Sequence, residues 1–393
     1  MKSKMPRKTN SRAAQGSGTI RQRPDGRWEA RYTVGRDPGT GKQIQRSIYG
    51  ATQKEVRQRL QQVEISIDDG TYVQPSRLEV GEWLNVWLND YCVDLKPGTI
   101  SLYRRHIRNY LAPYIGAVKL CELSPHMVQR LYNRLATGKD GAPTLTPKTV
   151  KNVHGILHRA MEQAAEIGYL KLNPVDHCKP PRVEKPEIKP LDGAAISKFL
   201  TAIQGHQYEA VYIVDLFTGM RQSEILGLTW DCIDFEDGTI RIYRQFQLID
   251  GVYQFGALKN DKPRTIVPAP SVLEVLKEQR RKQREWKLRA GNLWQNADDF
   301  VFTDEFGKHL ARQSVYHQFK AVMKRIGLPD TRFHDLRHSY AVASIQAGDD
   351  IKTVQENLGH HTAAFTLDVY GHVTGKMKRA SANRMEAFIQ RVK

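Results

Sequence analysis

A proline-rich segment at residues 173–190 divides the chain into two parts. Five of its 18 residues are proline, which has no backbone N–H to donate and cannot continue a regular helix or central strand. The segment therefore predicts an extended linker between separately folded regions. The chain has 393 residues, enough for two to four domains at roughly 100–200 residues each.

Positive charge is concentrated near the N-terminus. The first 63 residues contain 15 Lys or Arg and four Asp or Glu, so they carry +11 of the formal net charge of +18. A surplus of this size is typical of proteins that bind a polyanion, most often nucleic acid. The alternative is a basic arm that only keeps the chain in solution. We expect residues 1–18, which are small, polar and basic, to be a disordered tail.

Residues 19–75 have the pattern of a small β-sheet followed by one helix. The middle strand alternates strictly between apolar and polar residues, as a strand with one buried face does. Thr52 and Glu55 have the spacing of a capping box, and an apolar stripe that starts at Val56 follows them. The expected strands are Thr19–Gln22, Arg27–Val34 and Gln43–Tyr49.

Residues 76–172 have the period of α-helices. Apolar residues recur in four stripes at three- and four-residue spacing, which predicts four amphipathic helices packed as a bundle. Ser124 followed by Pro125 predicts the start of the third helix, because Ser is a favoured N-cap and Pro a favoured first residue. The four stripes begin at Trp83, Ile100, Val128 and Val150.

Residues 191–393 predict a mixed, mainly helical domain, so the fold class is multidomain α+β. An apolar helix is expected around Tyr208–Phe217, and the helical pattern returns from Ala311 onward. Between them, turn-forming pairs such as Asp-Gly separate short strands that we expect to form one antiparallel sheet. The strands are Ile240–Arg244, Val252–Leu258 and Arg264–Val267.

Composition excludes several other classes of protein. The sequence has no run of 18 apolar residues and no apolar stretch after its basic N-terminus, so we expect neither a membrane span nor a secretory signal. Its four cysteines are scattered, without a C-x-x-C pair. This favours a reducing, cytoplasmic compartment over a disulfide framework, and argues against a zinc finger.

Four segments of the last region contain side chains suited to phosphodiester chemistry. Arg grips a phosphate with a planar fork of donors, Lys and His transfer protons, and Tyr becomes a nucleophile where its target is electrostatically prepared. Each segment alone has a simpler explanation: Arg221 and Glu224 could form a surface ion pair, for instance, and Lys262 competes with Lys259 for the same role. The segments are 218–224 (TGMRQSE), 258–264 (LKNDKPR), 334–338 (HDLRH) and 358–372 (LGHH to TLDVYGH).

In this order the four segments closely resemble the motifs of the tyrosine recombinase (phage-integrase) family, especially integrases of conjugative transposons. The resemblance covers essentially the whole chain. It implies an arm-site DNA-binding domain at 19–75, a helical core-binding domain at 76–172, the linker at 173–190 and a catalytic domain with a C-terminal tail at 191–393. Tail residues 376–393 would dock on a neighbouring subunit or on their own domain.

Carried over by motif, the resemblance gives each candidate a role. Arg221 and Arg337 would clamp the phosphate, Lys259 would be the general acid, and His334 a base or orienting group; His360 would donate to the phosphate and Tyr370 would be the nucleophile. Tyr370 lies ten residues after His360, whereas many family members have nine. The second choices are Tyr340, which falls inside the predicted HDLRH helix, His338 and His361.

The implied reaction is a transesterification. Tyr370 attacks a DNA phosphodiester, forms a 3′-phosphotyrosyl link and releases a 5′ hydroxyl, and a 5′ hydroxyl from a partner strand reverses the step. Such an enzyme integrates and excises a mobile element. It needs no metal, ATP or other cofactor, because the protein–DNA link conserves the bond energy and the positive clamp replaces a metal ion.

The resemblance also implies partners and a location. The partners are double-stranded DNA with core and arm sites, three further copies of the chain in a tetramer, and an excision factor or a host DNA-bending factor. The location is the bacterial cytoplasm, at the nucleoid and away from the membrane. We expect the arm sheet to enter the major groove with outward side chains at Arg27, Glu29, Arg31 and Thr33. The candidate DNA-binding residues are Arg21, Arg23, Arg27 and Arg31.

Two other functions are compatible with parts of this pattern. A type IB topoisomerase-like enzyme uses the same cleavage chemistry without exchanging partners, but has no reason to carry a separate arm-type module. A DNA-binding regulator that kept the fold would not need the full set of Arg, Lys, His and Tyr. Covalent trapping on a nicked substrate excludes the regulator, and strand exchange between two duplexes excludes the topoisomerase.

Overall fold

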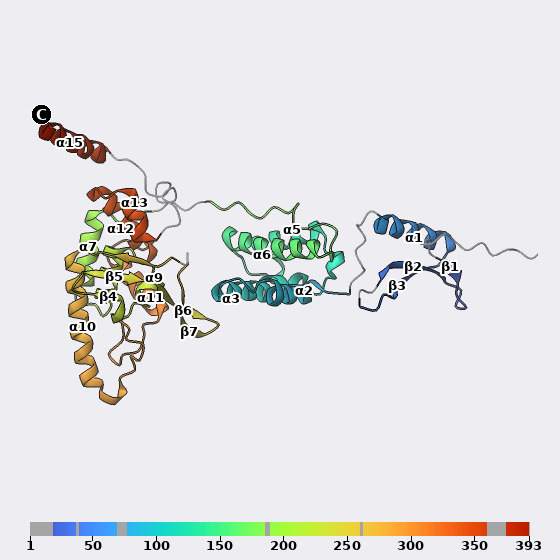
Figure 1. Ribbon diagram of the computed structural model, residues 1–393, viewed down its shortest axis with the longest axis horizontal. Helices are drawn as coiled ribbons and strands as arrows, with labels where there is room; N and C mark the ends of the chain where they lie inside the picture. Colours follow the sequence, from blue (N-terminus) through green and yellow to red (C-terminus); the bar gives the residue numbers. More distant parts are fainter. Residues whose placement is uncertain are drawn as a thin grey trace, which may run out of the picture. The chain divides into compact units, whose positions relative to one another are not determined.

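The computed structural model describes residues 19–36, 39–68, 77–184, 189–259, 262–359 and 375–392. The chain forms two compact units, Met1–Glu184 and Lys185–Lys393, each of which is described by itself (Figure 1). None of the helices in these ranges is both long and apolar enough to cross a bilayer. The predicted tail 1–18 lies outside the described residues.

The first unit begins with the predicted three-stranded sheet. Strands β1 (Thr19–Gln22), β2 (Trp28–Arg36) and β3 (Gln43–Gly50) pair antiparallel in that order. Helix α1 (Gln53–Asp68) packs on one face, where Ala30 and Tyr32 meet its apolar stripe (Figure 1). The capping box is a variant of the predicted one: the Thr52 hydroxyl accepts the Glu55 N–H at 3.3 Å, while the Glu55 carboxylate accepts the Ala51 N–H at 3.1 Å.

A helical bundle follows, with the four predicted amphipathic segments around one core. Trp83 lies fully buried at its centre, and its indole N–H donates to the Ala160 carbonyl at 2.8 Å. The Ser124 hydroxyl caps the third segment by accepting the Met127 N–H, as its sequence predicted. The elements are α2 (Val80–Val86) with the π-helical turn Trp87–Tyr91; α3 (Pro97–His106) with Ile107–Leu111 and α4 (Ala112–Ile115); α5 (Pro125–Thr137); and α6 (Pro147–Glu166).

The extended linker is shorter than predicted at its N-terminal end. Val175 and Cys178 are buried in the bundle core. The Asn173 amide donates to the His158 carbonyl at 3.1 Å and to Glu162 at 2.9 Å. These apolar and hydrogen-bonded contacts hold residues 173–178 against the bundle in spite of the proline at 174, so proline content alone placed the boundary too early.

The second unit has one core shared by helices and short strands. Its elements are α7 (Gly193–Ile203), α8 (Glu209–Thr218), α9 (Gln222–Ile225), β4 (Ile233–Asp234), β5 (Thr239–Ile242), β6 (Arg244–Ile249), β7 (Val252–Ala257), β8 (Arg264–Ile266), α10 (Pro270–Ala290), α11 (Arg312–Arg325), α12 (His334–Ala347), α13 (Ile351–Leu358) and α15 (Gly375–Val392). Helix α15 contains the predicted apolar stripe of the tail, with Met385, Phe388 and Val392 exposed.

The strands of this unit form two sheets, so the prediction of one three-stranded sheet was wrong. Strands β4, β5 and β8 make one sheet, and β6 pairs only with β7 among the described strands. Asp250 and Gly251 both have positive φ, at 49° and 86°. Two such residues close a tight hairpin, which pairs 252–257 with 244–249 rather than with its other sequence neighbours.

Gly219 allows three helices to meet. It caps the C-terminus of α8 with φ +61°, and its N–H donates to the Asp215 carbonyl at 2.9 Å. A Cβ at this position would lie 2.4 Å from Tyr340 Cδ1 on α12 and 2.8 Å from Leu358 Cδ2 on α13. Glycine is therefore required both for the left-handed backbone and for the close approach of the neighbouring helices.

We expect Gly219→Ala to destabilise the second unit more than Gly238→Ala. Gly238 has a similar φ of +65°, but an added Cβ would meet only Leu273 Cδ1 at an ordinary 3.5 Å. The control should therefore lose only the left-handed backbone cost of about 1–2 kcal/mol. Gly219→Ala should lose about 1–3 kcal/mol more through overpacking. Denaturant midpoints of the two variants give the comparison, and equal losses would mean that the contact with Tyr340 is readily relieved.

Candidate active site

Three arginine side chains converge on the last carbonyls of α13. Arg264 Nε donates to the Asn357 carbonyl at 2.8 Å, Arg337 Nη2 to the Leu358 carbonyl at 2.5 Å, and Arg221 Nη2 to the Gly359 carbonyl at 3.2 Å. These carbonyls end the helix without helical partners and carry the negative end of its dipole. The two arginines predicted to clamp the phosphate, Arg221 and Arg337, are thus brought together.

Arg337 is held by the ends of two helices. It lies on α12 with 2% of its surface exposed, and its Nη1 donates to the Gly219 carbonyl at the end of α8 at 2.6 Å. Its Nη2 donates to the Leu358 carbonyl of α13. Main-chain acceptors from two helices fix the plane of a guanidinium more tightly than a flexible side chain would, so Arg337 is preorganised in the protein without DNA.

Glu224 binds two of the three arginines. Its carboxylate accepts from the Arg221 N–H at 2.9 Å and Nη1 at 2.7 Å, and from Arg264 Nη2 at 2.6 Å and Nη1 at 3.2 Å. Burial raises the pKa of Glu224, but the hydrogen bonds and charges of Arg264 and Arg221 outweigh it and bring the pKa to about 2. Glu224 is buried, so the simpler explanation of Arg221 and Glu224 as a surface ion pair is wrong.

His334 and His338 lie one turn apart on α12, with ring centroids 4.8 Å apart. Burial of part of each ring and nearby positive charges lower both pKa values to about 4; Arg337 contributes to both shifts. Both imidazoles are therefore neutral near pH 7, the form that can accept a proton. His334 is exposed, whereas His338 is buried. Exposure favours His334, the first-choice histidine of the sequence analysis, for contact with a substrate.

The remaining predicted residues are placed only in part. Lys259 follows β7 at the edge of a described range, and Lys262 opens the next range before β8. Tyr340 lies on α12, where its hydroxyl accepts from Asn357 Nδ2 at 3.2 Å and its ring packs beneath Gly219. The other three residues of the proposed site, His360, His361 and Tyr370, lie outside the described residues.

Sequence reasoning missed two charged residues of this cluster. Arg264 fell in the candidate segment 258–264 and in a predicted strand but was given no role, although its place two residues before the buried Ile266 puts both on one face of β8. Asp215 on α8 has 1% of its surface exposed, and its Oδ1 has no hydrogen-bond partner among the described residues. Burial raises the pKa of Asp215 well above its usual value in spite of the attraction of Arg337. The sequence does contain a signal for it: Asp215 is the one charged residue of the apolar stretch 210–217.

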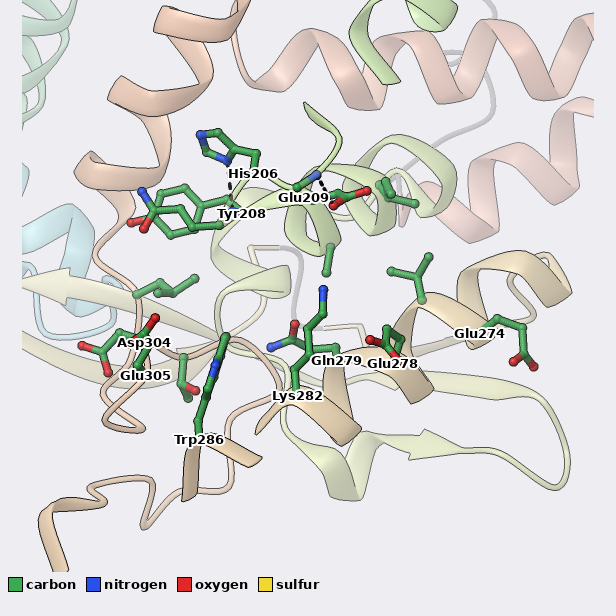
Figure 2. Close-up of a pocket in the computed structure, with 17 residues that line it drawn as sticks. His206, Tyr208, Glu209, Glu274, Glu278, Gln279, Lys282, Trp286, Asp304 and Glu305 are labelled. Carbon is green, nitrogen blue, oxygen red and sulfur yellow. Dashed lines mark hydrogen bonds between the residues drawn. The ribbon is translucent and has the colours of Figure 1, made fainter. Parts of the chain in front are cut away.

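A cavity of about 770 Å³ in this unit has the wrong charge for DNA. Figure 2 shows its walls, which include Glu209 of α8, Glu274 and Glu278 of α10, and Asp304 and Glu305 of the loop after α10. Carboxylates repel a phosphate backbone, and none of the converging arginines lines this cavity. The guanidinium groups at the end of α13, unlike this cavity, have the charge and the donors that can hold a phosphate.

One group of described residues has donor atoms close enough for a metal ion. His158, Glu162 and Asp176 of the bundle bring one potential ligand atom each to within 4.8 Å of the others. His158 Nε2 already lies 2.9 Å from Asp176, and Glu162 accepts from Asn173. These contacts give the three residues a role in holding residues 173–178 on the bundle.

Both units of the chain match known protein families. The family model described as the phage integrase family matches residues 190–377, and the model of a phage integrase N-terminal SAM-like domain matches residues 80–136. A tyrosine recombinase XerC-like protein of Caldanaerobacter subterraneus subsp. tengcongensis is 32% identical over 88% of this chain and 92% of the relative. The ICEBs1 integrase of Bacillus subtilis is 22% identical over 94% of this chain and 99% of its own length.

Solved structures share the fold. The Tn1549 transposon integrase in complex with transposon right end DNA is 22% identical, covers 78% of this chain and 99% of its own, and has a TM-score of 0.65. A lambda integrase tetramer bound to a Holliday junction is 18% identical, covers 88% of this chain and 96% of its own, and has a TM-score of 0.54. The chain belongs to the phage integrase family of tyrosine recombinases, the enzymes that cut and rejoin DNA strands in site-specific recombination.

Proposed function

We propose that this recombinase integrates and excises a mobile element by cutting core sites at a phosphate held between Arg221 and Arg337. The observation that carries the proposal is the convergence of these two guanidinium groups on the end of α13, at the carbonyls of the first two residues of the LGH motif. Glu224 and the main-chain carbonyls fix both groups before DNA arrives. Two fixed forks suit the non-bridging oxygens of one phosphodiester, whose charge grows in the transition state.

The remaining candidates then have complementary tasks. Tyr370 attacks phosphorus, forms the 3′-phosphotyrosyl bond and breaks the bond to the 5′ oxygen. His334, neutral near pH 7, accepts the tyrosine proton as the bond forms. Lys259 gives a proton to the departing 5′ oxygen, and His360 donates a hydrogen bond to the phosphate. Attack by the 5′ hydroxyl of a partner strand reverses each step, so the exchange needs no energy source.

The N-terminal sheet supplies a second DNA contact in this proposal. Its strands place Arg21 and Arg31 on the face opposite α1, and the domain binds arm sites away from the cleavage position. Four copies act together on two core sites, as supported by the relative that is solved as a tetramer on a Holliday junction. An excision factor or a host DNA-bending factor is a further partner in this proposal, and the reaction takes place on the bacterial chromosome in the cytoplasm.

Tyr370→Phe should abolish covalent attachment and leave DNA affinity nearly unchanged. The hydroxyl is the nucleophile, whereas affinity comes mainly from Lys and Arg contacts with phosphates. A duplex nicked near the cleavage position traps the covalent complex of the wild type, which gel electrophoresis detects. Tyr340→Phe is the matched control and should still form the complex. A covalent band from the Tyr370 variant would assign the nucleophile elsewhere.

Arg221→Lys and Arg337→Lys should each lower the cleavage rate by roughly 10²–10³-fold, the usual cost of losing one preorganised transition-state donor. Each variant keeps the charge and loses the planar fork. Single-turnover cleavage of the nicked duplex measures the rate. Arg281→Lys, at an exposed site on α10, is the control and should cleave normally. Normal rates in both test variants would remove these arginines from the active site.

Removal of the first 72 residues should abolish binding to arm sites and leave cleavage of core sites intact. A chain starting at Val73 should still cleave isolated core sites, because every catalytic candidate lies beyond residue 200. It should lose the footprint at arm sites, and its binding to DNA with both kinds of site should depend less steeply on salt, because fewer phosphates are neutralised. Identical footprints of the two chains would mean that the basic module contacts no separate site.

A further inference from the structure

One face of the N-terminal sheet is charged and contains a buried carboxylate. Helix α1 covers the face of Ala30 and Tyr32. On the opposite face, Arg21 of β1, Glu29 of β2 and Tyr49 of β3 lie side by side in the strand register. Among the described residues that face is polar, and we expected Glu29 to be exposed there. Instead its side chain is only 3% exposed, while those of Arg21 and Arg31 are 57% and 47% exposed.

Glu29 is buried because two arginines and a serine surround its carboxylate. Arg21 reaches Oε2 with Nε at 2.8 Å and with Nη2 at 2.7 Å. Arg31 Nε donates to Oε1 at 3.1 Å, and the Ser47 hydroxyl donates to the same oxygen at 2.9 Å. The hydrogen bond from Arg21, followed by the one from Ser47, lowers the pKa of Glu29 to about 2. The carboxylate is thus a permanent anion that joins all three strands.

An anion in this position weakens the attraction of the sheet for phosphates in general. The first 63 residues carry 15 basic side chains, so a negative charge at the centre of their exposed face opposes rather than assists binding to any DNA. What Glu29 does provide is geometry. It holds Arg21 through Nε and Nη2 and Arg31 through Nε, while both arginine side chains stay about half exposed to an incoming ligand. A fixed guanidinium also loses less side-chain freedom on binding than a mobile one.

We propose that Arg21, Glu29 and Arg31 form a preorganised reader of guanine bases in the major groove, with Glu29 as the positioning residue. This inference rests on the proposed arm-site function and names what the arm domain recognises. Arg presents two donors to the O6 and N7 acceptors of guanine, the commonest specific contact with DNA. The register places Arg21 opposite Glu29 and Arg31 opposite Thr19, so the two arginines are diagonal neighbours roughly 7–8 Å apart on the sheet, about two base-pair steps of 3.4 Å. The arm site therefore contains guanine at two nearby positions.

The test uses the full chain and separates specificity from charge. Duplexes are selected from a random library by the full chain, and those also selected by the chain starting at Val73 are discarded. Affinities of wild type and Glu29→Gln for the selected duplexes and for random duplexes are then measured by fluorescence anisotropy. Glu55→Gln, which removes the same charge from α1 and keeps an oxygen for the Ala51 N–H, is the matched control. Arg31→Lys identifies the base pair that Arg31 reads.

Glu29→Gln should bind random DNA as tightly as wild type or more tightly, and yet lose roughly tenfold in preference for the selected duplexes. The guanine preference at both positions should weaken together, whereas Arg31→Lys should weaken one of them. Equal gains on both kinds of DNA, as expected for Glu55→Gln, would reduce Glu29 to a simple charge and overturn the inference. Loss of binding to both kinds with a lowered melting temperature would make Glu29 a folding residue, which also overturns it. If the wild type selects no duplex beyond those of the shortened chain, the arm-site function itself fails.

Discussion

The C-terminal end of α13 is the point on which the catalytic unit depends. Its carbonyls receive Arg264, Arg337 and Arg221 in successive positions, and these residues come from β8, α12 and the start of α9. A helix C-terminus carries a partial charge of about −0.5, which offsets part of the repulsion among the three cations. Glu224, whose pKa is about 2, supplies one full negative charge, and burial raises the pKa of nearby Asp215. The cluster is therefore arranged to receive a further anion, and a DNA phosphate has the charge and the acceptors to be it.

The same constraint explains why glycine ends both α8 and α13. Gly219 and Gly359 have φ values of +61° and +62°, the left-handed backbone that commonly ends a helix, and the carbonyls at both helix ends accept from arginine donors. A Cβ on Gly359 would lie 3.0 Å from Arg264 Nη1, a tight contact but a less close one than the 2.4 Å contact that Gly219 avoids. The glycines of the TG pair before Arg221 and of the LG pair before His360 thus have a structural cause. Each glycine ends a helix at a point where an arginine donates to the carbonyls of the helix end.

Much of the fold could be predicted from local patterns, and the contacts between segments could not. The strands of the N-terminal sheet and the four segments of the bundle were predicted from the spacing of apolar residues. An element that buries one face has apolar residues at the period of that face, two in a strand and about 3.6 in a helix. The partner of β7 was misjudged, since pairing is set by the Asp250-Gly251 turn and not by strand composition. Arg264 was missed for a related reason. Its importance comes from Glu224 and Asn357, which lie 40 and 93 residues away in the sequence.

In both units, a buried carboxylate positions a pair of arginine side chains. Glu29 lies between Arg21 and Arg31, and Glu224 between Arg221 and Arg264. In each case the carboxylate is buried and its pKa is about 2, below the ordinary value of 4.5. A carboxylate with a depressed pKa stabilises the fold fully above its unfolded value and loses that contribution only as the pH falls toward 2. Both arginine pairs therefore keep their geometry throughout the physiological range, in which His334 and His338 are already neutral. In the functions proposed above, a phosphate or a base meets guanidinium groups whose positions were fixed during folding, so little of the binding energy is spent on ordering them.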